Sequence, residues 1–104
     1  MYDIESIRVL YSSHAVEYSQ HFRQRMKERN ISFTDVRPAI QNGEIIEQDL
    51  KDIPNPSVLI LGYARDNKPI HVVVGVDDNK LILITAYFPN PILWETDYKT
   101  RKAD

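Results

Sequence analysis

A nine-residue segment that begins at His21 combines the residue types needed to act on a phosphate. His21, Arg25 and Arg29 recur every four residues, so a helix here would align an imidazole and two guanidiniums along one side. Phe22 and Met26 have the same spacing on a neighbouring side, which predicts that this side faces a hydrophobic core. Because histidine titrates near neutral pH and arginine keeps its charge, the segment suits acid–base chemistry on a phosphate.

His71 and Thr85 each interrupt an otherwise apolar segment that reads as a strand. Whether the two side chains share a face depends on the turn after Val76. A two-residue turn places His71 opposite Ala86, whereas a three-residue turn places His71 opposite Tyr87 and puts all three polar residues on one face. The sequence leaves both turns open. A core-edge histidine and the β-propensity of threonine and tyrosine are the alternative, purely structural interpretation.

Length and composition predict one globular domain over residues 1–104. Hydrophobic residues make up 42% of the chain and charged residues 27%, a balance typical of a folded domain. The chain has no apolar run long enough to span a membrane, and the absence of cysteine favours a cytoplasmic location. Three scattered histidines without cysteine argue against a metal site, so we expect no metal and no other cofactor.

The charge is unevenly distributed along the chain. The net charge is −2, yet residues 21–29 and residues 98–102 each carry +3, which leaves −8 elsewhere. A local positive face is therefore compatible with an acidic chain, and Arg101 becomes a further candidate cation from the tail. Charge runs are also common on solvated surfaces without a ligand, and this alternative stays open.

The first half of the chain reads as helical. Apolar spacing predicts a helix over 3–11, and Ser19 is a plausible N-cap for a second helix that runs to Arg29. Residues 32–35 resemble a capping box for a third helix that stops at Asn42. A brief extended segment is expected within residues 14–18.

The second half reads as a meander of strands. Apolar segments near 44–50, 57–64, 70–76 and 80–87 are separated by turn residues, and short connections make neighbours antiparallel. The tail should fold back, because an exposed Trp94 would be unusual. The expected fold class is α+β, with N-terminal helices packed on one face of an antiparallel sheet of about four strands.

The motifs in this order resemble a bacterial group known as domain-of-unknown-function family 4258. The segment HFRQRMKERNIS, from His21 to Ser32, is similar to the family's Ser-x-His-Ala-x-x-Arg-Met-x-x-Arg-x-Ile opening, with Phe22 where alanine is usual. The resemblance continues through Asp35-Val36, Gly43-Glu44-Ile45-Ile46, Pro54-x-Pro56-Ser57, His71-Val72-Val73-Val74, Thr85-Ala86-Tyr87-x-Pro89, Trp94-Glu95 and Arg101-Lys102.

That family is similar to the RelE-like and BrnT-like ribonuclease toxins, which place helices against a curved antiparallel sheet. Many members lie beside genes for zinc-finger antitoxins of the MqsA type. The resemblance therefore implies a cytoplasmic, metal-independent endoribonuclease toxin that acts on RNA and has an antitoxin protein as its partner.

RNA cleavage without a metal needs a base for the 2′-hydroxyl, cations for the phosphorane and an acid for the leaving 5′-oxygen. His21 and His71 are the base and acid candidates, in either order, and the catalytic set is His21, His71, Arg25 and Thr85. Arg29, Tyr87 and Arg101 are the expected RNA-binding residues. The alternative is a non-catalytic binding module, whose basic face docks a protein partner or a nucleic acid.

Overall fold

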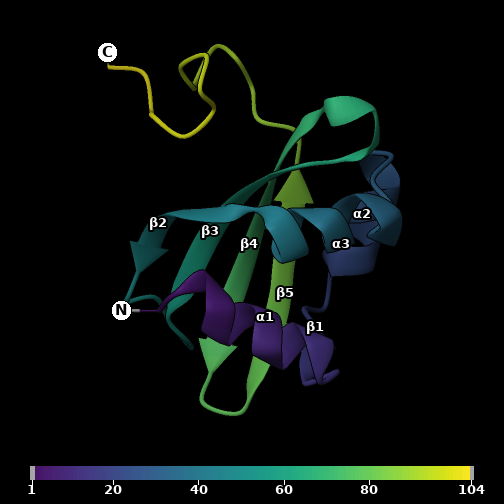
Figure 1. Cartoon of the computed structure of the whole chain (residues 1–104), viewed down its shortest axis with the longest axis vertical. Helices are drawn as coiled ribbons and strands as arrows, with labels where there is room; N and C mark the ends of the chain where they lie inside the picture. The colour runs from purple at the N-terminus through teal and green to yellow at the C-terminus, as the bar shows by residue number, and fades with distance from the viewer. Residues whose placement is uncertain (1, 104) are drawn as a thin grey trace.

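Three helices and five strands form the described chain. The structure is a computed structural model that describes residues 2–103. The helices are α1 (Ile4–Ser12), α2 (Phe22–Glu28) and α3 (Phe33–Asn42). The strands are β1 (Val16–Tyr18), β2 (Glu44–Asp49), β3 (Ser57–Tyr63), β4 (Pro69–Asp77) and β5 (Lys80–Tyr87), with a 3-10 turn η1 (Arg65–Asn67) before β4 (Figure 1).

The strands form one open, mixed sheet in the order β1-β5-β4-β3-β2. The four expected strands make up its antiparallel part. The expectation of about four strands is wrong by one, because β1 joins the sheet parallel to β5, with Val16 opposite Leu81. The brief extended segment expected within residues 14–18 contains this strand, but three residues are too few to predict that it joins the sheet. In the fold, the backbone of these three residues hydrogen-bonds to the outer edge of β5, which would otherwise be unpaired.

Local capping explains where α1 and α3 begin. The Asp3 side chain accepts a hydrogen bond from the backbone N–H of Ser6 at 2.8 Å, at the start of α1. The predicted capping box is present at the start of α3, where Ser32 and Asp35 bond each other's backbone reciprocally. These short-range contacts are readable from sequence because they join residues only three apart.

The second helix is shorter than expected. It starts at Phe22, with His21 at the N-cap and no side-chain cap, so the assignment of Ser19 as the cap is wrong. The Ser19 hydroxyl donates instead to the carbonyl oxygen of Ile84 at 3.0 Å, which ties the end of β1 to β5. Asn30 adopts a φ of 56° just beyond the helix, in the left-handed region suited to a helix stop.

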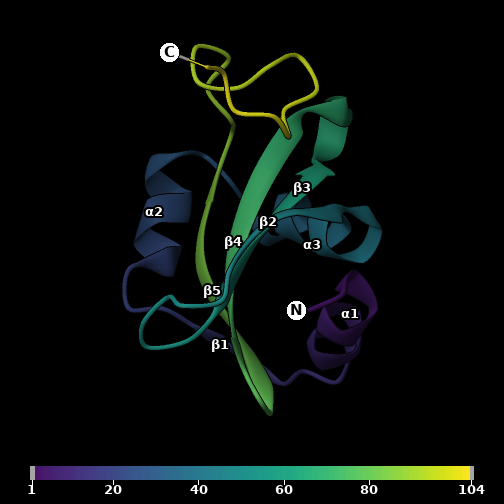
Figure 2. The same cartoon turned by 90° about the vertical axis from the view of Figure 1, so that its left-hand side faces the viewer.

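The helices do not form a single layer. Figure 2 shows α1 and α3 together on one side of the sheet, with α2 set apart beside β5. The expected one-face layer therefore holds for α1 and α3, while α2 covers the part of β5 that extends beyond short β1. Phe22 and Met26 of α2 are buried in the common core, as their spacing predicted. No helix in residues 2–103 is long and apolar enough to cross a bilayer.

The turn between β4 and β5 is the short one. Asp77 pairs with Lys80, so the turn contains two residues. In an uninterrupted ladder this turn would place His71 opposite Ala86. Thr85 and Tyr87 would then lie on the other face of the sheet from His71.

A β-bulge in β5 nevertheless pairs His71 with Tyr87. The register shifts by one residue at Ile84, which has no partner on β4, so His71 lies opposite Tyr87. Thr85 falls on the same face, next to them. The arrangement expected only from a three-residue turn is thus produced by a two-residue turn and one extra residue inside β5.

Candidate functional site

One face of the sheet gathers most of the predicted site residues. Because side chains alternate along a strand, His71 points away from the face that carries Val72 and the helical core. The pairing adds Tyr87 directly beside His71, and Thr85 two pairs further along, opposite Val73. The surface formed by His71, Thr85 and Tyr87 is called the His71 face below.

Hydrogen bonds define the protonation state of His71. Its side chain has no exposed surface, and Nε2 lies 2.6 Å from the carbonyl oxygen of Tyr98. A carbonyl oxygen only accepts, so Nε2 carries the hydrogen and Nδ1 accepts from the Tyr87 hydroxyl at 3.3 Å. Burial lowers the pKa of His71, against the opposite effects of the Tyr98 hydrogen bond and the Glu47 charge. The ring is therefore neutral at pH 7.

The C-terminal tail covers the His71 ring. Trp94 is 3% exposed and packs edge-on against His71, with ring centroids 4.6 Å apart. The guanidinium carbon of Arg101 lies 4.6 Å from the centroid of the Trp94 ring. Arg101 also donates two hydrogen bonds to the Glu47 carboxylate, at 2.7 and 3.0 Å. The expected fold-back of the tail is confirmed, and it brings Arg101 to the His71 face.

Arg29 reaches the same face from the helix end. One guanidinium nitrogen donates to Thr85 Oγ1 at 2.7 Å and to the carbonyl oxygen of Ala86 at 2.9 Å. Arg29 occupies the C-cap of α2, where its backbone N–H bonds the carbonyl oxygen of Arg25. A cation at a helix C-terminus is favourable, so α2 both positions and stabilises this guanidinium.

Charged groups around Tyr87 have opposite effects on the pKa of its hydroxyl. Burial raises the pKa of its hydroxyl above the ordinary value. The positive charges of Arg101 and Arg29 act to lower that pKa, and the Glu47 carboxylate acts to raise it. The hydroxyl is therefore protonated at neutral pH, but it is within electrostatic range of two guanidiniums that would stabilise negative charge.

A small open cavity adjoins this group. It has a volume of about 210 Å³ and is lined by Tyr87 and Arg101, with the carboxylates Glu47 and Asp49 on the β2 side. The apolar floor comes from Leu59 of β3 and its neighbours. A phosphate-sized ligand could therefore reach Tyr87 next to the tail.

Two predicted catalytic residues lie apart from these contacts. His21 and Arg25 are exposed on α2, and neither side chain forms an ion pair within residues 2–103. His21 precedes Arg29 by eight residues, about 12 Å along a helix. Of His21, Arg25 and Arg29, only Arg29 forms a side-chain hydrogen bond to the His71 face within residues 2–103.

Sequence reasoning did not assign Glu47 and Tyr98 to this site. Glu47 follows a register shift in β2, between Ile45 and Glu47, so alternation in the sequence does not reveal which face it occupies. Tyr98 contributes through its backbone carbonyl, which any residue carries. Its φ of 58° is a tertiary feature without a sequence signal of its own.

No set of three or more histidine, aspartate and glutamate side chains within residues 2–103 is arranged to hold a metal ion. The expectation of metal-independent chemistry stays a prediction.

The comparison with known families identifies the group to which the chain belongs. Residues 18–88 match the model of a family described as a domain of unknown function (DUF4258), and the match covers about two thirds of the chain. The chain is therefore a member of that family, as its motifs indicated. The comparisons with curated proteins and with solved structures gave no match, so the likeness to RelE-type and BrnT-type toxins stays a prediction.

The family match includes most of the candidate site but not the tail. Arg29, His71, Thr85 and Tyr87 lie inside residues 18–88, whereas Trp94 and the residues after it lie outside. The cover over His71 thus comes from a segment that the family model does not describe.

Proposed function

We propose that the protein is a metal-independent endoribonuclease whose active group is the His71 face, and that it is the toxin of a bacterial toxin–antitoxin pair. The observation that supports this function best is the position of the Tyr87 hydroxyl. It lies 3.3 Å from a neutral proton acceptor, His71 Nδ1, and within electrostatic range of Arg29 and Arg101. Acid–base catalysis beside a phosphate needs this combination.

In the proposed reaction, Tyr87 contacts the RNA and His71 takes up the proton behind it. The proton of the 2′-hydroxyl passes to the Tyr87 oxygen while the Tyr87 proton passes to His71 Nδ1. The 2′-oxygen then bonds to phosphorus, the bond from phosphorus to the 5′-oxygen breaks, and the 5′-oxygen takes a proton from water. The products are a 2′,3′-cyclic phosphate and a 5′-hydroxyl, and the imidazolium returns its proton to solvent.

The charged neighbours have separate roles in this proposal. Arg29 and Arg101 stabilise the phosphorane, because guanidiniums keep their charge and donate forked hydrogen bonds. Thr85 holds Arg29 at 2.7 Å. The Glu47 charge favours the imidazolium form of His71. His21 and Arg25, on the exposed side of α2, contact the RNA strand rather than the reacting phosphate.

The test is cleavage of a labelled RNA oligonucleotide by the purified protein in the presence of EDTA. We expect a 2′,3′-cyclic product, no cleavage where the 2′-hydroxyl is replaced by hydrogen, and a loss of at least about 100-fold in Tyr87→Phe and in His71→Gln. Lys80→Gln is the control, because Lys80 lies at the opposite end of β5 from Tyr87. Equal rates in the wild type and Tyr87→Phe would remove the proposed mechanism.

A non-catalytic binding module is the second candidate. In its favour, His71 is fully buried with both ring nitrogens bonded, and the carboxylates Glu47 and Asp49 line the cavity beside Tyr87. Carboxylates weaken phosphate binding. The basic residues would then dock an acidic protein, such as a zinc-finger antitoxin of the MqsA type.

Expression in cells separates the two candidates. A toxin should arrest growth, and co-expression of the product of a neighbouring gene should relieve the arrest. Under the catalytic proposal, Tyr87→Phe abolishes the arrest but still binds the neighbouring product. Under the binding proposal, Tyr87→Phe arrests growth as the wild type does.

A further inference from the structure

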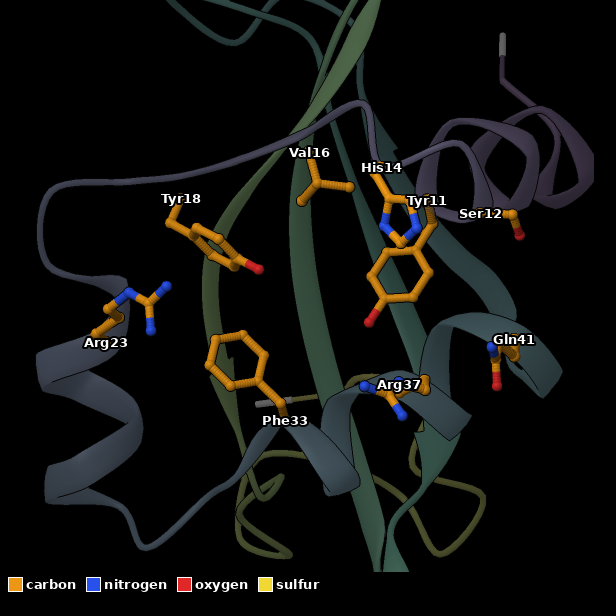
Figure 3. Close-up of a pocket in the computed structure, with 9 residues that line it drawn as sticks. All are labelled: Tyr11, Ser12, His14, Val16, Tyr18, Arg23, Phe33, Arg37 and Gln41. Atoms are coloured by element: carbon orange, nitrogen blue, oxygen red, sulfur yellow. The ribbon is translucent and has the colours of Figure 1, made fainter.

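A second, larger cavity lies away from the His71 face, where α1, α2 and α3 surround β1. Its volume is about 690 Å³, and it is open to solvent on one side. Figure 3 shows Val16 between Tyr18 and Tyr11, and the rings of Tyr11, Tyr18 and Phe33 point toward the middle of the cavity. This volume falls within the range of about 300–1,000 Å³ that small-molecule sites occupy.

Aromatic rings and a guanidinium form one wall of this cavity. Tyr18 and Phe33 pack edge to face, with ring centroids 5.4 Å apart. The guanidinium carbon of Arg23 lies 4.7 Å from the Tyr18 centroid and 5.3 Å from the Phe33 centroid. Tyr18 remains 42% exposed, although it is large and aromatic. In this structure the Arg23 guanidinium, which stays charged, lies over the two rings in the position that a planar ligand would take.

The other side of the cavity adds positive charge and polar groups. Arg37 of α3 and His14 of the loop after α1 line it, together with the Tyr11 hydroxyl and the Gln41 amide (Figure 3). His14 adopts a φ of 61°, a left-handed conformation that turns the chain from α1 into β1. Two guanidiniums and an imidazole thus come from three separate segments to one cavity.

Nothing lining the cavity cancels this charge. Its lining contains no carboxylate, and neither Arg23 nor Arg37 forms an ion pair within residues 2–103. The neighbouring carboxylate on β1, Glu17, is bonded to Lys80 at 2.7 Å. In a chain of net charge −2, two guanidiniums without a carboxylate partner in residues 2–103 produce a local positive potential at one concave site, and this potential attracts an anion.

From these contacts we infer that the cavity binds a nucleotide. On binding, the Arg23 guanidinium turns from the Tyr18 and Phe33 rings to the phosphate, and the base takes its place on the rings, as bases commonly do on aromatic side chains in proteins that bind single strands. Arg23 and Arg37 bond the phosphate. The Tyr11 hydroxyl, which lies between Phe33 and Arg37 (Figure 3), is placed to bond the polar edge of the base or the ribose. This site is separate from the His71 face and does not depend on RNA cleavage.

The bound nucleotide is either a free mononucleotide or one residue of a single-stranded RNA. The test is isothermal titration calorimetry of the full chain with each of four ligands: a 5′-mononucleotide, the matching nucleoside, inorganic phosphate and a short single-stranded RNA. We expect the mononucleotide or the RNA to bind at least about tenfold more tightly than the nucleoside or phosphate, because both contacts are then made at once. Binding of the RNA alone would assign the site to a strand, and binding of the mononucleotide would assign it to the free ligand.

Variants locate the binding. Arg37→Gln and Arg23→Gln change exposed side chains, and each should weaken binding by about tenfold, the usual effect of losing one charge-assisted hydrogen bond. Lys51→Gln removes the same charge from an exposed loop and is the matched control. Tyr18→Leu keeps an apolar contact with Phe22 but removes the stacking surface.

The decisive outcome is the comparison among these variants. If Arg37→Gln and Arg23→Gln bind as tightly as Lys51→Gln does, or if phosphate alone binds as tightly as the mononucleotide, the inference is overturned. NMR provides a second measurement that does not rely on variants: the largest shift changes on titration should fall in residues 11–18, at Arg23 and in residues 33–41.

Discussion

At the scale of single residues, His71 shows how the surroundings of a side chain determine its chemistry. In the sequence it is one histidine in an apolar strand. In the fold it is fully buried, with one ring nitrogen donating to the Tyr98 carbonyl and the other accepting from Tyr87. Burial lowers its pKa, so the folded protein holds His71 as a neutral proton acceptor.

This lowered pKa predicts how stability depends on pH. Folded His71 binds a proton less readily than unfolded histidine, whose pKa is about 6.5. The contribution of His71 to the free energy of unfolding is therefore present above pH 6.5 and is lost as the pH falls below that value. The loss amounts to about 1.4 kcal/mol for each unit by which folding lowers the pKa. Urea unfolding should show a lower free energy at pH 5.5 than at pH 7.5, and a smaller difference in His71→Gln.

The window from pH 7.5 to 5.5 isolates this effect from the carboxylates. The pKa values of Asp3, Asp35 and Asp97 are lowered from 3.8, so their contributions are lost only in more acidic solution. An identical pH dependence in the wild type and His71→Gln would contradict a buried, neutral His71.

Arg29 is the other residue whose role depends on its contacts. Its guanidinium bonds Thr85 and Ala86, whereas Arg25, one turn earlier, is exposed. Arg29→Ala should lower the free energy of unfolding by about 1–2 kcal/mol, and Arg25→Ala should change it by less than about 0.5 kcal/mol.

A double-mutant cycle with Thr85→Val measures this contact. Valine has the shape of threonine without the hydroxyl, so the cycle removes the Arg29–Thr85 bond with little change in packing. The interaction energy between the two sites should be at least about 0.5 kcal/mol. Additive effects would mean that the 2.7 Å hydrogen bond contributes nothing to stability.

At the scale of elements, the bulge in β5 decides the composition of the His71 face. A two-residue turn alone would bring Ala86 opposite His71. The extra residue, Ile84, lets Tyr87 and Thr85 share the face of His71 while Leu83 stays in the core. Bulges are common where a side chain has to be redirected, and this bulge redirects the side chains of Thr85 and Tyr87.

Deletion of Ile84 tests this account. Without the extra residue the ladder becomes regular and every other β4–β5 pair is kept, so we expect a folded protein that loses no more than about 2 kcal/mol. Deletion of Ile82, a half-buried isoleucine in the same strand, is the matched control. It displaces Leu83 from the core or breaks the pairing with β1, and it should cost more than about 3 kcal/mol.

Urea unfolding measures both deletions, and the NMR contact between the rings of His71 and Tyr87 reports the pairing. Loss of that contact in the Ile84 deletion, or equal stability of the two deletion variants, would show that the bulge does not set the register.

At the scale of the whole molecule, the spacing between layers depends on one glycine. Gly62 of β3 is buried beneath α3, and a Cβ at this position would overlap the backbone and the Cβ of Ala39. The helix can therefore lie close to the sheet. Gly75, in the neighbouring strand, has no such restriction, because the nearest atom to an added Cβ is Ile84 Cδ1 at 3.4 Å.

Alanine at these two positions should act in opposite directions. Gly62→Ala pushes α3 away from the sheet, and we expect a loss of about 1–3 kcal/mol or more in the free energy of unfolding. Gly75→Ala should be neutral or should stabilise the protein by up to about 1 kcal/mol, because alanine has less freedom to lose on folding. Thermal unfolding of both variants checks this, and a neutral Gly62→Ala would contradict the close packing.

Features that depend on neighbouring residues could be predicted from the sequence alone. The capping box at Ser32, the end of α3 at Asn42 and the buried pair Phe22 and Met26 all agree with prediction. These features are local, since they depend on residues within one or two helical turns. The four antiparallel strands and the family could also be predicted, because apolar segments, turn residues and the order of motifs are visible in the sequence itself.

Contacts between distant segments, in contrast, could not be predicted and become visible in the fold. The parallel pairing of β1, the bulge at Ile84 and the tail over His71 each join segments far apart in sequence or depend on one unpaired residue. Helical spacing predicts which side chains share a side of a helix, but not which of them reach the sheet. Arg29 therefore hydrogen-bonds Thr85 of the His71 face, whereas His21 forms no such bond within residues 2–103. Such contacts depend on the packing of whole elements, and no local pattern encodes them.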